Sequence, residues 1–342
     1  MKILEFNYNL PEERIAKYPP KKRGSTKLLV VNRQTGRILN RKYTDISKYI
    51  KKGDVIVLNE TKVRKQRTFF VAPNGREVQL LFLNLIRHYD GNEIWYCLIG
   101  RARDVKEGDI LRCIEILVKV GKRESDGFLV SIPEGHSEIL FEKYGHTPIP
   151  PYMKRKDNSN DYIRYNTVFA HLEGSVAAPT ASLNLTSEIL ADIEKRGAKI
   201  AKIALDVGWG TFAPIREENI EDHKIHKEKI SVEKKAVEII NNAKKKGGDI
   251  WAFGTTVART LESVSDINGY IKEYNGDTEL YIYPGYKWKC VNHLITNFHM
   301  PDSSLILLVS SFAGRDLIKK AYEKALKSDY KFLSYGDSML II

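Results

Sequence analysis

The chain has 342 residues, of which 42% are hydrophobic and 10% aromatic. This composition supports a buried core, and the length suits two domains of roughly 100 to 200 residues each, which excludes a wholly disordered chain and a small disulfide-stapled one. Lys and Arg total 55 against 43 Asp and Glu, a formal net charge of +12. We therefore expect an anionic partner.

The three cysteines, Cys97, Cys113 and Cys290, are widely spaced and form no C-x-x-C pair. A disulfide framework or a cysteine zinc site is therefore not supported, and a reducing compartment is indicated. The N-terminus lacks an apolar signal core, and the longest apolar stretch, near residues 305–311, is far shorter than the ~20 residues that span a bilayer. We expect a soluble cytoplasmic protein with no membrane partner.

The excess charge lies entirely in the first 70 residues, which hold 18 Lys and Arg against 6 Asp and Glu. Apolar, strand-like runs at residues 28–31 and 55–58 separate the basic groups, so these are charges on a folded surface. Such a face is a candidate for binding nucleic-acid phosphates, although basic residues that only keep a surface hydrated remain the alternative. The candidate RNA contacts are Lys21, Lys22, Arg23, Arg64, Lys65 and Arg67.

The predicted elements change in character along the chain. From about residue 68 to 140, short alternating runs bounded by glycines and charged turns indicate a β-rich unit, with runs at 78–85, 94–99, 110–120 and 127–132. After the proline-rich segment 148–151, helices predicted at 187–196 and 233–246 are each closed by glycine and followed by strands at 199–207 and 249–253. We predict a discontinuous α/β body, a mixed sheet with helices formed by residues 1–64 plus 148–342, and an inserted small β-barrel at 65–147.

A G-x-G-x-x-A pattern begins at Gly208, directly after a predicted strand. A dinucleotide fingerprint would need a helix to start there, but Pro214 follows and residues 215–222 lack helical periodicity. The two glycines, Gly208 and Gly210, still permit a ligand to approach the backbone closely, and Asp206 could accept hydrogen bonds from a ribose.

Asp222, His223, His226 and Glu228 form a compact cluster of titratable groups. Their spacing is not the H-E-x-x-H of zinc hydrolases, which weakens a metal site. Histidines beside acids are equally suited to proton transfer near neutral pH, and an ordinary surface loop is the third possibility.

Two further segments are candidate ligand contacts. Thr255 and Thr256 precede a predicted helix that carries Arg259, an arrangement that suits a carboxylate or phosphate, although plain helix capping would look the same. Asn297 and His299 lie between an apolar strand and an apolar helix, so both need partners, structural or in a substrate. A similar polar turn near the C-terminus contains Asp337.

Long motifs along nearly the whole chain resemble those of the S-adenosylmethionine:tRNA ribosyltransferase-isomerase family of queuosine biosynthesis. They are YNLPEERI at 8–15, GDVIVLNETKV at 53–63, GHTPIPPY at 145–152, GSVAAPTASLNLT at 174–186, VGWGTF at 207–212, EDHKIHKE at 221–228, GTTVARTLES at 254–263, YPGY at 283–286, LITNFHMP at 294–301 and SYGDSML at 334–340. Their number and order make a chance resemblance implausible, and the family fold agrees with the architecture predicted above.

The resemblance implies transfer and isomerisation of the ribosyl group of S-adenosylmethionine, as co-substrate and without a metal, onto 7-aminomethyl-7-deazaguanine at the tRNA wobble position. The products are epoxyqueuosine, adenine and methionine. In this chemistry a base removes a proton from the 5′ carbon beside the sulfonium, adenine leaves, the aminomethyl nitrogen attacks, and loss of methionine closes the epoxide. We also expect a monomer that binds the anticodon arm of tRNA.

Residue by residue, the resemblance implies a set of catalytic and substrate-binding positions. The candidate catalytic residues are Asp206, His223, His226, Glu228 and His299, and the candidate substrate-binding residues are Thr180, Asn184, Gly208, Gly210, Thr211, Thr255, Thr256, Arg259, Asn297 and Asp337. The chain departs from the family pattern at Asn184 and Asp206, where the family has histidine, and at Ser182, where it has glycine. These departures leave open a divergent paralogue with a small-molecule acceptor, or a non-catalytic RNA- or nucleotide-binding paralogue.

Overall fold

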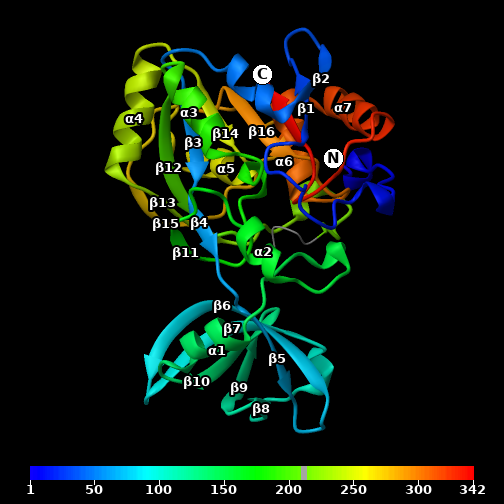
Figure 1. The fold of residues 1–342 in the computed structure, drawn as a ribbon, viewed down its shortest axis with the longest axis vertical. Helices are drawn as coiled ribbons and strands as arrows, with labels where there is room; N and C mark the ends of the chain where they lie inside the picture. The colour runs from blue at the N-terminus through cyan, green and yellow to red at the C-terminus, as the bar shows by residue number, and fades with distance from the viewer. Residues whose placement is uncertain (209–213) are drawn as a thin grey trace.

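The computed structural model describes residues 1–208 and 214–342. Figure 1 shows two domains of unequal size, a larger α/β domain that contains both termini and a smaller β domain below it. Their hydrophobic cores are separate, because the buried side chains of the β domain form a cluster of their own. The predicted combination of an α/β body with an inserted β-barrel is confirmed.

The α/β domain is built on a mixed sheet that has nine strands within the described residues, in the order β15-β13-β12-β3-β14-β16-β17-β1-β2. β12, β3, β14 and β16 run parallel to one another, whereas β13 pairs antiparallel with β12 and β17 pairs antiparallel with β16. The strands are β1 (Lys27–Val31), β2 (Ile38–Lys42), β3 (Val55–Asn59), β12 (Lys199–Leu205), β13 (Glu228–Val232), β14 (Ile250–Phe253), β15 (Tyr274–Thr278), β16 (His293–Asn297) and β17 (Ser338–Ile341).

Helices cover both faces of this sheet, which explains the continuous apolar runs of the central strands. Leu29 and Val31 of β1 belong to one core with residues of α4, α5, α6 and α7, whereas Leu28 and Val30 belong to a second core with α3. The helices are α3 (Ser187–Lys195), α4 (Lys234–Lys245), α5 (Thr255–Val264), α6 (Ser304–Ala313) and α7 (Arg315–Lys327). The predicted glycine stops are present, since Gly197 and Gly247 follow α3 and α4 with positive φ.

The smaller domain is a closed antiparallel barrel in the order β10-β7-β6-β5-β8-β9, so it leaves no open edge. Its elements are β5 (Arg67–Val71), β6 (Glu77–Tyr89), β7 (Asn92–Gly100), β8 (Ile110–Cys113), β9 (Ile116–Glu124), β10 (Gly127–Pro133) and α1 (His136–Tyr144). Phe82, Trp95 and Phe141 meet edge to face in the core, and Phe141 comes from α1. The run at 110–120, predicted as one strand, is two, because Ile114 turns the chain with φ of 54°.

The chain crosses between the domains twice, and the two crossings pair through an isolated bridge between Arg67 and His146. Beside them, β4 (Thr61–Val63) pairs with β11 (Leu172–Ser175), and α2 (Ser159–Arg164) lies at the front of the junction (Figure 1). The barrel elements fall inside 65–147, the insert that we propose from the sequence. Among the described residues, no helix is both long and apolar enough to cross a membrane.

Candidate active site in the cleft between the domains

The two domains border a cleft of about 1390 Å³. We call its two sides the body wall, which includes the segment just after β12 and the segment leading into β13, and the barrel wall, which comes mainly from β6 and β7. The body wall holds five predicted site residues: Asp206, Gly208, His223, His226 and Glu228. They come together because β12 and β13 are neighbours in the sheet, so the end of one strand lies beside the start of the other.

Asp206 lies directly after β12, where its N–H donates to the carbonyl of Lys229 at 2.9 Å. Asn59 fixes the preceding residue, since its Oδ1 accepts the Leu205 N–H and its Nδ2 donates to the Leu205 carbonyl. The carboxylate lies against Gly174, where φ is +147° and an added Cβ would come within 3.3 Å of Oδ1. Burial raises the pKa of Asp206; Lys229 opposes the shift and Glu228 adds to it.

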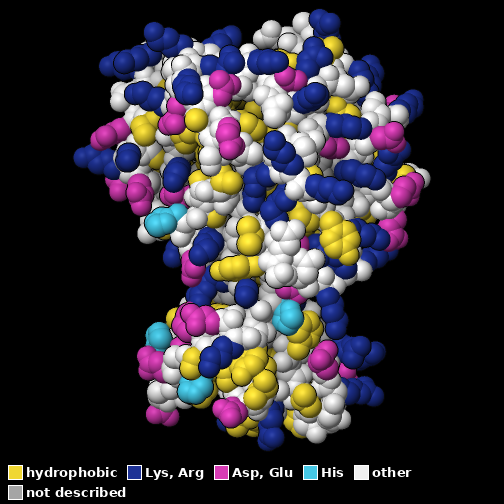
Figure 2. Space-filling model, in the orientation of Figure 1, with side chains coloured by type: hydrophobic (Ala, Val, Ile, Leu, Met, Phe, Trp, Pro, Cys, Tyr) yellow, Lys and Arg dark blue, Asp and Glu magenta, His cyan; other side chains and the backbone are white. Residues whose placement is uncertain are grey.

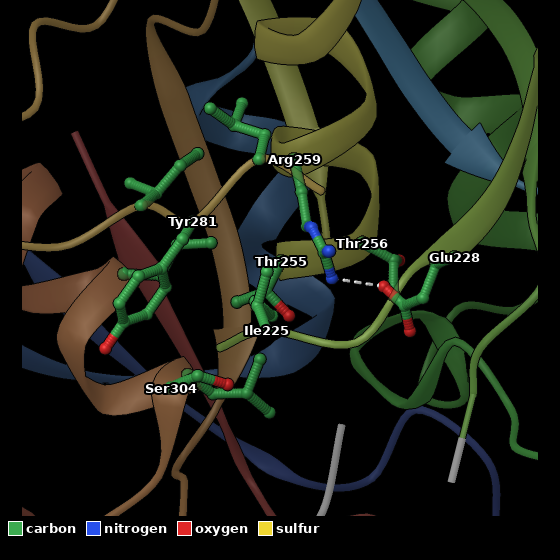
Figure 3. A pocket seen from close by; sticks show the side chains of 11 residues that line it. Ile225, Glu228, Thr255, Thr256, Arg259, Tyr281 and Ser304 are labelled. Atoms are coloured by element: carbon green, nitrogen blue, oxygen red, sulfur yellow. Dashed lines mark hydrogen bonds and ion pairs between the residues drawn. The ribbon is translucent and has the colours of Figure 1, made fainter. Parts of the chain in front are cut away.

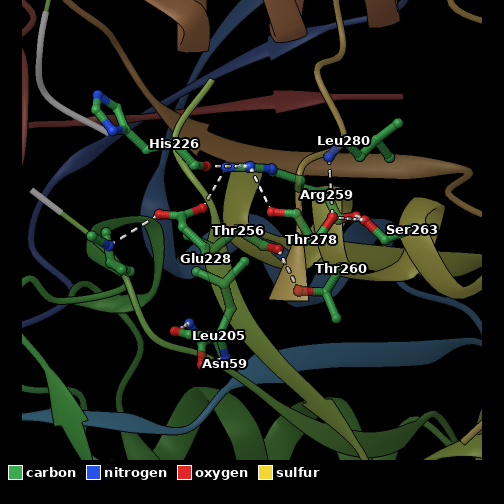
Figure 4. Close-up of polar contacts among 12 residues, drawn as sticks. Asn59, Leu205, His226, Glu228, Thr256, Arg259, Thr260, Ser263, Thr278 and Leu280 are labelled. Carbon is green, nitrogen blue, oxygen red and sulfur yellow. Dashed lines mark hydrogen bonds and ion pairs between the residues drawn. The ribbon is translucent and has the colours of Figure 1, made fainter. Parts of the chain in front are cut away.

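Glu228 is a buried carboxylate held from two sides (Figure 4). One oxygen accepts the Gly208 N–H at 3.1 Å, and the other forms an ion pair with Arg259. The guanidinium of Arg259 also donates to the carbonyls of His226 and Thr278, at 3.1 and 3.4 Å. Glu228 therefore holds the backbone of Gly208, and Arg259 holds the backbone of His226 and Thr278. Removing either side chain would leave the other charge buried without its ion-pair partner.

Behind Glu228 lies a small pocket at the start of α5, lined by Thr255, Thr256 and Arg259 (Figure 3). Its volume is about 20 Å³, which is room for about one water molecule. The Thr256 hydroxyl is buried and has no hydrogen-bond partner among the described residues. These three predicted substrate contacts therefore lie together in a pocket of their own, and Glu228 lines both this pocket and the main cleft.

The two histidines of the cluster differ in their surroundings. The Nδ1 atom of His223 lies 3.0 Å from the Glu217 carboxylate, and its ring meets Tyr281 edge-on at 5.6 Å. His226 is exposed on the cleft, while its backbone carbonyl accepts from Arg259. No group of three or more His, Cys, Asp or Glu among the described residues could hold a metal ion. The arrangement favours proton transfer, with His223 oriented and His226 free to approach a ligand.

Four more predicted site residues lie outside the cleft, buried in contacts within the α/β domain. Asn184 donates to the Gly336 carbonyl at 3.0 Å, and Asn297 donates to the Asp337 carbonyl at 3.5 Å. The Asp337 carboxylate accepts the N–H groups of Lys27 and Lys331. Asn184, Asn297 and Asp337 thus stabilise turns around β17, while the buried Asn297 Oδ1 has no hydrogen-bond partner among the described residues. That these residues bind substrate stays a prediction.

His299 is the fourth, and it lies away from the cleft that holds the other predicted catalytic residues, so its role as a catalytic acid or base stays a prediction. Its ring is buried, with Nε2 2.7 Å from the Thr296 hydroxyl. Burial lowers the pKa of His299 to about 3, so the imidazole stays neutral at working pH. Of the other predicted contacts, Thr180 begins a short 3₁₀ turn and does not line the cleft, and Gly210 and Thr211 lie outside the described residues.

The predicted RNA contacts differ in whether their cationic groups already have partners within the protein. Arg67 is buried and donates to the Ile149 carbonyl, and Arg23 donates to the Leu183 and Asn166 carbonyls, so both guanidiniums are occupied by the protein's own backbone. Arg64 lines the cleft but is paired with Glu138 and Glu173. Lys21, Lys22 and Lys65 have no ion pair among the described residues. Arg23 and Arg67 therefore hold the protein's own backbone, and direct phosphate binding by them stays a prediction.

Comparison with known proteins identifies the family. A family model described as queuosine biosynthesis protein matches residues 3–341. Proteins named S-adenosylmethionine:tRNA ribosyltransferase-isomerase from Thermoanaerobacter sp. and Chlorobium phaeobacteroides are 44% and 40% identical to the chain, each over the full length of both proteins. The chain belongs to the queuosine biosynthesis protein family. The crystal structure of S-adenosylmethionine tRNA ribosyltransferase from Thermotoga maritima is 32% identical, covers 99% of this chain and 100% of its own, and has a TM-score of 0.57.

Within this queuosine biosynthesis fold, sequence reasoning missed two groups of residues that build the cleft, one behind its surface and one lining it. The first holds the Asp206 segment: Asn59, Gly174 and Ser175, whose hydroxyl accepts the Val207 N–H at 3.0 Å. Asn59 and Thr61 directly follow an apolar strand, a position that could have drawn attention to them. The second is the barrel wall, which includes Leu83, Leu85, Ile86, Trp95 and Tyr96. The alternating pattern of these residues predicts strands, and nothing in it indicates that they face a ligand site.

Proposed function

We propose that this chain is an S-adenosylmethionine:tRNA ribosyltransferase-isomerase, which transfers and isomerises the ribosyl group of S-adenosylmethionine onto 7-aminomethyl-7-deazaguanine at the wobble position of tRNA. Family membership over residues 3–341 and the names of the full-length relatives support this proposal. The observation that carries it is the cleft, which gathers one desolvated carboxylate, two histidines and an anchored glutamate between two domains.

Asp206 is the base in this proposal. The sulfonium acidifies the hydrogens on the 5′ carbon of the ribosyl group, and a carboxylate with a raised pKa is a stronger base than an ordinary one. The backbone contacts of Asp206 and Leu205 hold the carboxylate at the cleft without using its oxygens. Asp206 occupies a position where the family has histidine, so the same proton transfer is assigned to a different side chain.

The departing adenine needs a proton, and His223 and His226 are the groups on the body wall suited to supply one. His223 is oriented by Glu217, whereas His226 is exposed to the cleft. Glu228 acts as a positioning residue, because its two oxygens already accept from Gly208 and Arg259. The barrel wall excludes water from the developing charges through side chains such as Leu83, Ile86 and Leu98.

The same proposal covers the co-substrate, the macromolecular partner, the cellular location and the oligomeric state. We assign S-adenosylmethionine as co-substrate, no metal, and the anticodon arm of tRNA as the macromolecular partner. A cytoplasmic location follows from that tRNA substrate. The monomer expected from the sequence is a prediction that analytical ultracentrifugation checks.

The test mixes the protein with S-adenosylmethionine and tRNA that carries 7-aminomethyl-7-deazaguanine. We expect stoichiometric release of adenine and methionine, together with conversion of the wobble nucleoside to epoxyqueuosine by mass spectrometry. The matched control is the same tRNA with guanine at the wobble position, which should give no adenine. Adenine release that does not depend on the modified tRNA would refute the assigned acceptor, and no release at all would refute the reaction.

A further inference from the structure

Much of the charge near the domain junction lies on the surface around α2, outside the cleft. Figure 2 shows Lys and Arg side chains across the α/β domain on the face that carries α2. The carboxylates of this segment are occupied: Asp161 is buried against Arg155, Asp157 accepts the Thr147 N–H, and Glu12 pairs with Lys17 and Lys154. Cations that have no ion pair among the described residues remain here: Lys21, Lys22, Lys65, Lys156 and Arg164.

The first feature of this surface is a pair of arginines at the end of α2. Arg23 is fixed by three contacts to backbone carbonyls, including Asn166 at 3.0 Å. Burial, and then the charge of Arg164, lower the pKa of Arg23, so the two guanidiniums act on each other. The Nε atom of Arg164 is buried and has no partner among the described residues. Arg164 is therefore the member of the pair that can donate to a phosphate, and Arg23, held by backbone carbonyls, adds positive charge beside it.

The second feature is a pair of tyrosine rings, those of Tyr18 and Tyr162, each of which lies against a cationic side chain. Tyr18 is 60% exposed, and the Arg155 guanidinium lies 4.2 Å from the centre of its ring. Arg155 is itself fixed by Asp161 and by the Lys17 carbonyl, so it holds the exposed Tyr18 ring from one face. On α2, the ammonium of Lys65 lies 4.8 Å from the centre of the Tyr162 ring. Aromatic rings between Lys and Arg are typical of surfaces that stack unpaired bases and neutralise phosphates.

This surface is continuous with the cleft. Arg64, next to Lys65 in the chain, lines the cleft, and Lys62 and Arg64 both pair with Glu173, another cleft residue. We propose that the α2 surface, defined by Tyr18, Lys21, Lys22, Lys65, Lys156, Tyr162 and Arg164, is the docking face for the tRNA backbone, with Tyr18 stacking one unpaired base. The inference rests on the tRNA substrate proposed above and names the part of the protein that holds it beside the wobble nucleotide.

The test measures tRNA affinity by fluorescence anisotropy over a series of salt concentrations. The Lys65→Gln/Arg164→Gln variant should bind about tenfold more weakly and lower the slope of log affinity against log salt by ~1.4, that is ~0.7 for each lost contact with single-stranded phosphate. The matched control is Lys319→Gln/Lys320→Gln, which removes the same charge from exposed positions on α7 and should change neither quantity.

A second pair of variants separates stacking from charge. Tyr18→Ala should weaken tRNA binding about fivefold or more at an unchanged salt slope, because it removes a ring and no charge. Its control is Tyr270→Ala, since Tyr270 is also exposed and lies 5.9 Å from a lysine ammonium, that of Lys244. Both tyrosines are at the surface, so circular dichroism melts of the two variants should match the unmodified chain.

The outcomes separate this inference from the proposed function. Adenine release by the α2-surface variants should fall at low tRNA concentration and recover as tRNA approaches saturation. If the unmodified chain releases adenine but the α2-surface variants bind tRNA like their controls, the docking face is overturned and the reaction stands. If tRNA binding depends on these residues but no adenine appears, the docking face stands and the reaction fails.

Discussion

The two walls of the cleft are chemically different. The body wall carries titratable side chains, among them Asp206, His223 and Glu228, of which His223 and Glu228 are held by hydrogen bonds. The barrel wall carries mainly apolar and neutral groups, such as Leu83, Ile86 and Leu98. We expect the α/β domain to supply the groups that transfer protons. We expect the barrel to supply a low-polarity surface, which strengthens electrostatic interactions within the cleft.

The largest expected effect comes from Asp206→Asn on the body wall. The amide keeps the size of the side chain but cannot accept a proton, so adenine release should fall about 10²- to 10⁴-fold. A single-turnover adenine assay measures it. Asp126→Asn, the same change on the barrel wall where the carboxylate is exposed, should have a far smaller effect. Equal losses from both variants would remove the distinction between the walls.

Glu228→Gln tests whether the body wall depends on its buried ion pair. The substitution leaves the Arg259 charge buried without its carboxylate, so the free energy of unfolding should fall by about 3 kcal/mol. Urea unfolding monitored by circular dichroism provides the measurement. In contrast, Glu279→Gln breaks an exposed pair with Lys227 and should cost less than about 1 kcal/mol. A Glu228 variant as stable as the Glu279 variant would contradict the anchoring role.

His299 predicts how the stability of the α/β domain depends on pH. Because burial lowers its pKa to about 3, the unfolded chain binds a proton that the folded chain does not, between pH ~6.5 and about 3. Stability is therefore lost as pH falls through this window, by at most about 1.4 kcal/mol per pH unit from this group. Urea titrations at several pH values should show a shallower dependence in His299→Asn than in the control His171→Asn, which changes an exposed histidine.

The smallest expected effect is on the barrel wall. Leu83→Ala/Ile86→Ala should raise the KM for tRNA or S-adenosylmethionine roughly fivefold, because it trims apolar surface facing the cleft and removes no charge. Ile86 is 52% exposed, so the fold should persist. Steady-state kinetics would compare it with Leu117→Ala, an exposed leucine on β9 that does not line the cleft. A purely catalytic loss at unchanged KM would argue against the assigned role.

The sequence predicted the architecture well because the main elements carry local signs. Glycines close α3 and α4, and apolar runs without alternation correctly predicted strands buried on both faces, such as β3. The cluster of Asp222, His223, His226 and Glu228 could also be anticipated, since one family motif, EDHKIHKE at 221–228, contains all four, and Asp206 stood out as a departure from the family pattern. Their proximity in space required the pairing of β12 with β13, which no local pattern specifies.

Other predicted site residues show what a sequence pattern cannot decide. A polar residue in a turn looks the same in sequence whether it binds a ligand or a backbone amide, and Asp337 binds the amides of Lys27 and Lys331. His299 fits a catalytic motif but is buried beside Thr296. Alternation in β6 predicts which residues face away from the barrel core, but not that Leu83 faces the other domain. Burial and partners distant in sequence decide these cases.

The most direct test of the central claim is the pH dependence of single-turnover adenine release for the unmodified chain and for Asp206→His, which restores the family residue. If Asp206 is the base, the rate of the unmodified chain should fall in acid through a pKa above the ordinary carboxyl range. In the variant, the acid limb should move to higher pH, toward the ~6.5 of an imidazole. An acid limb at the same pH in both proteins would show that another group takes the first proton.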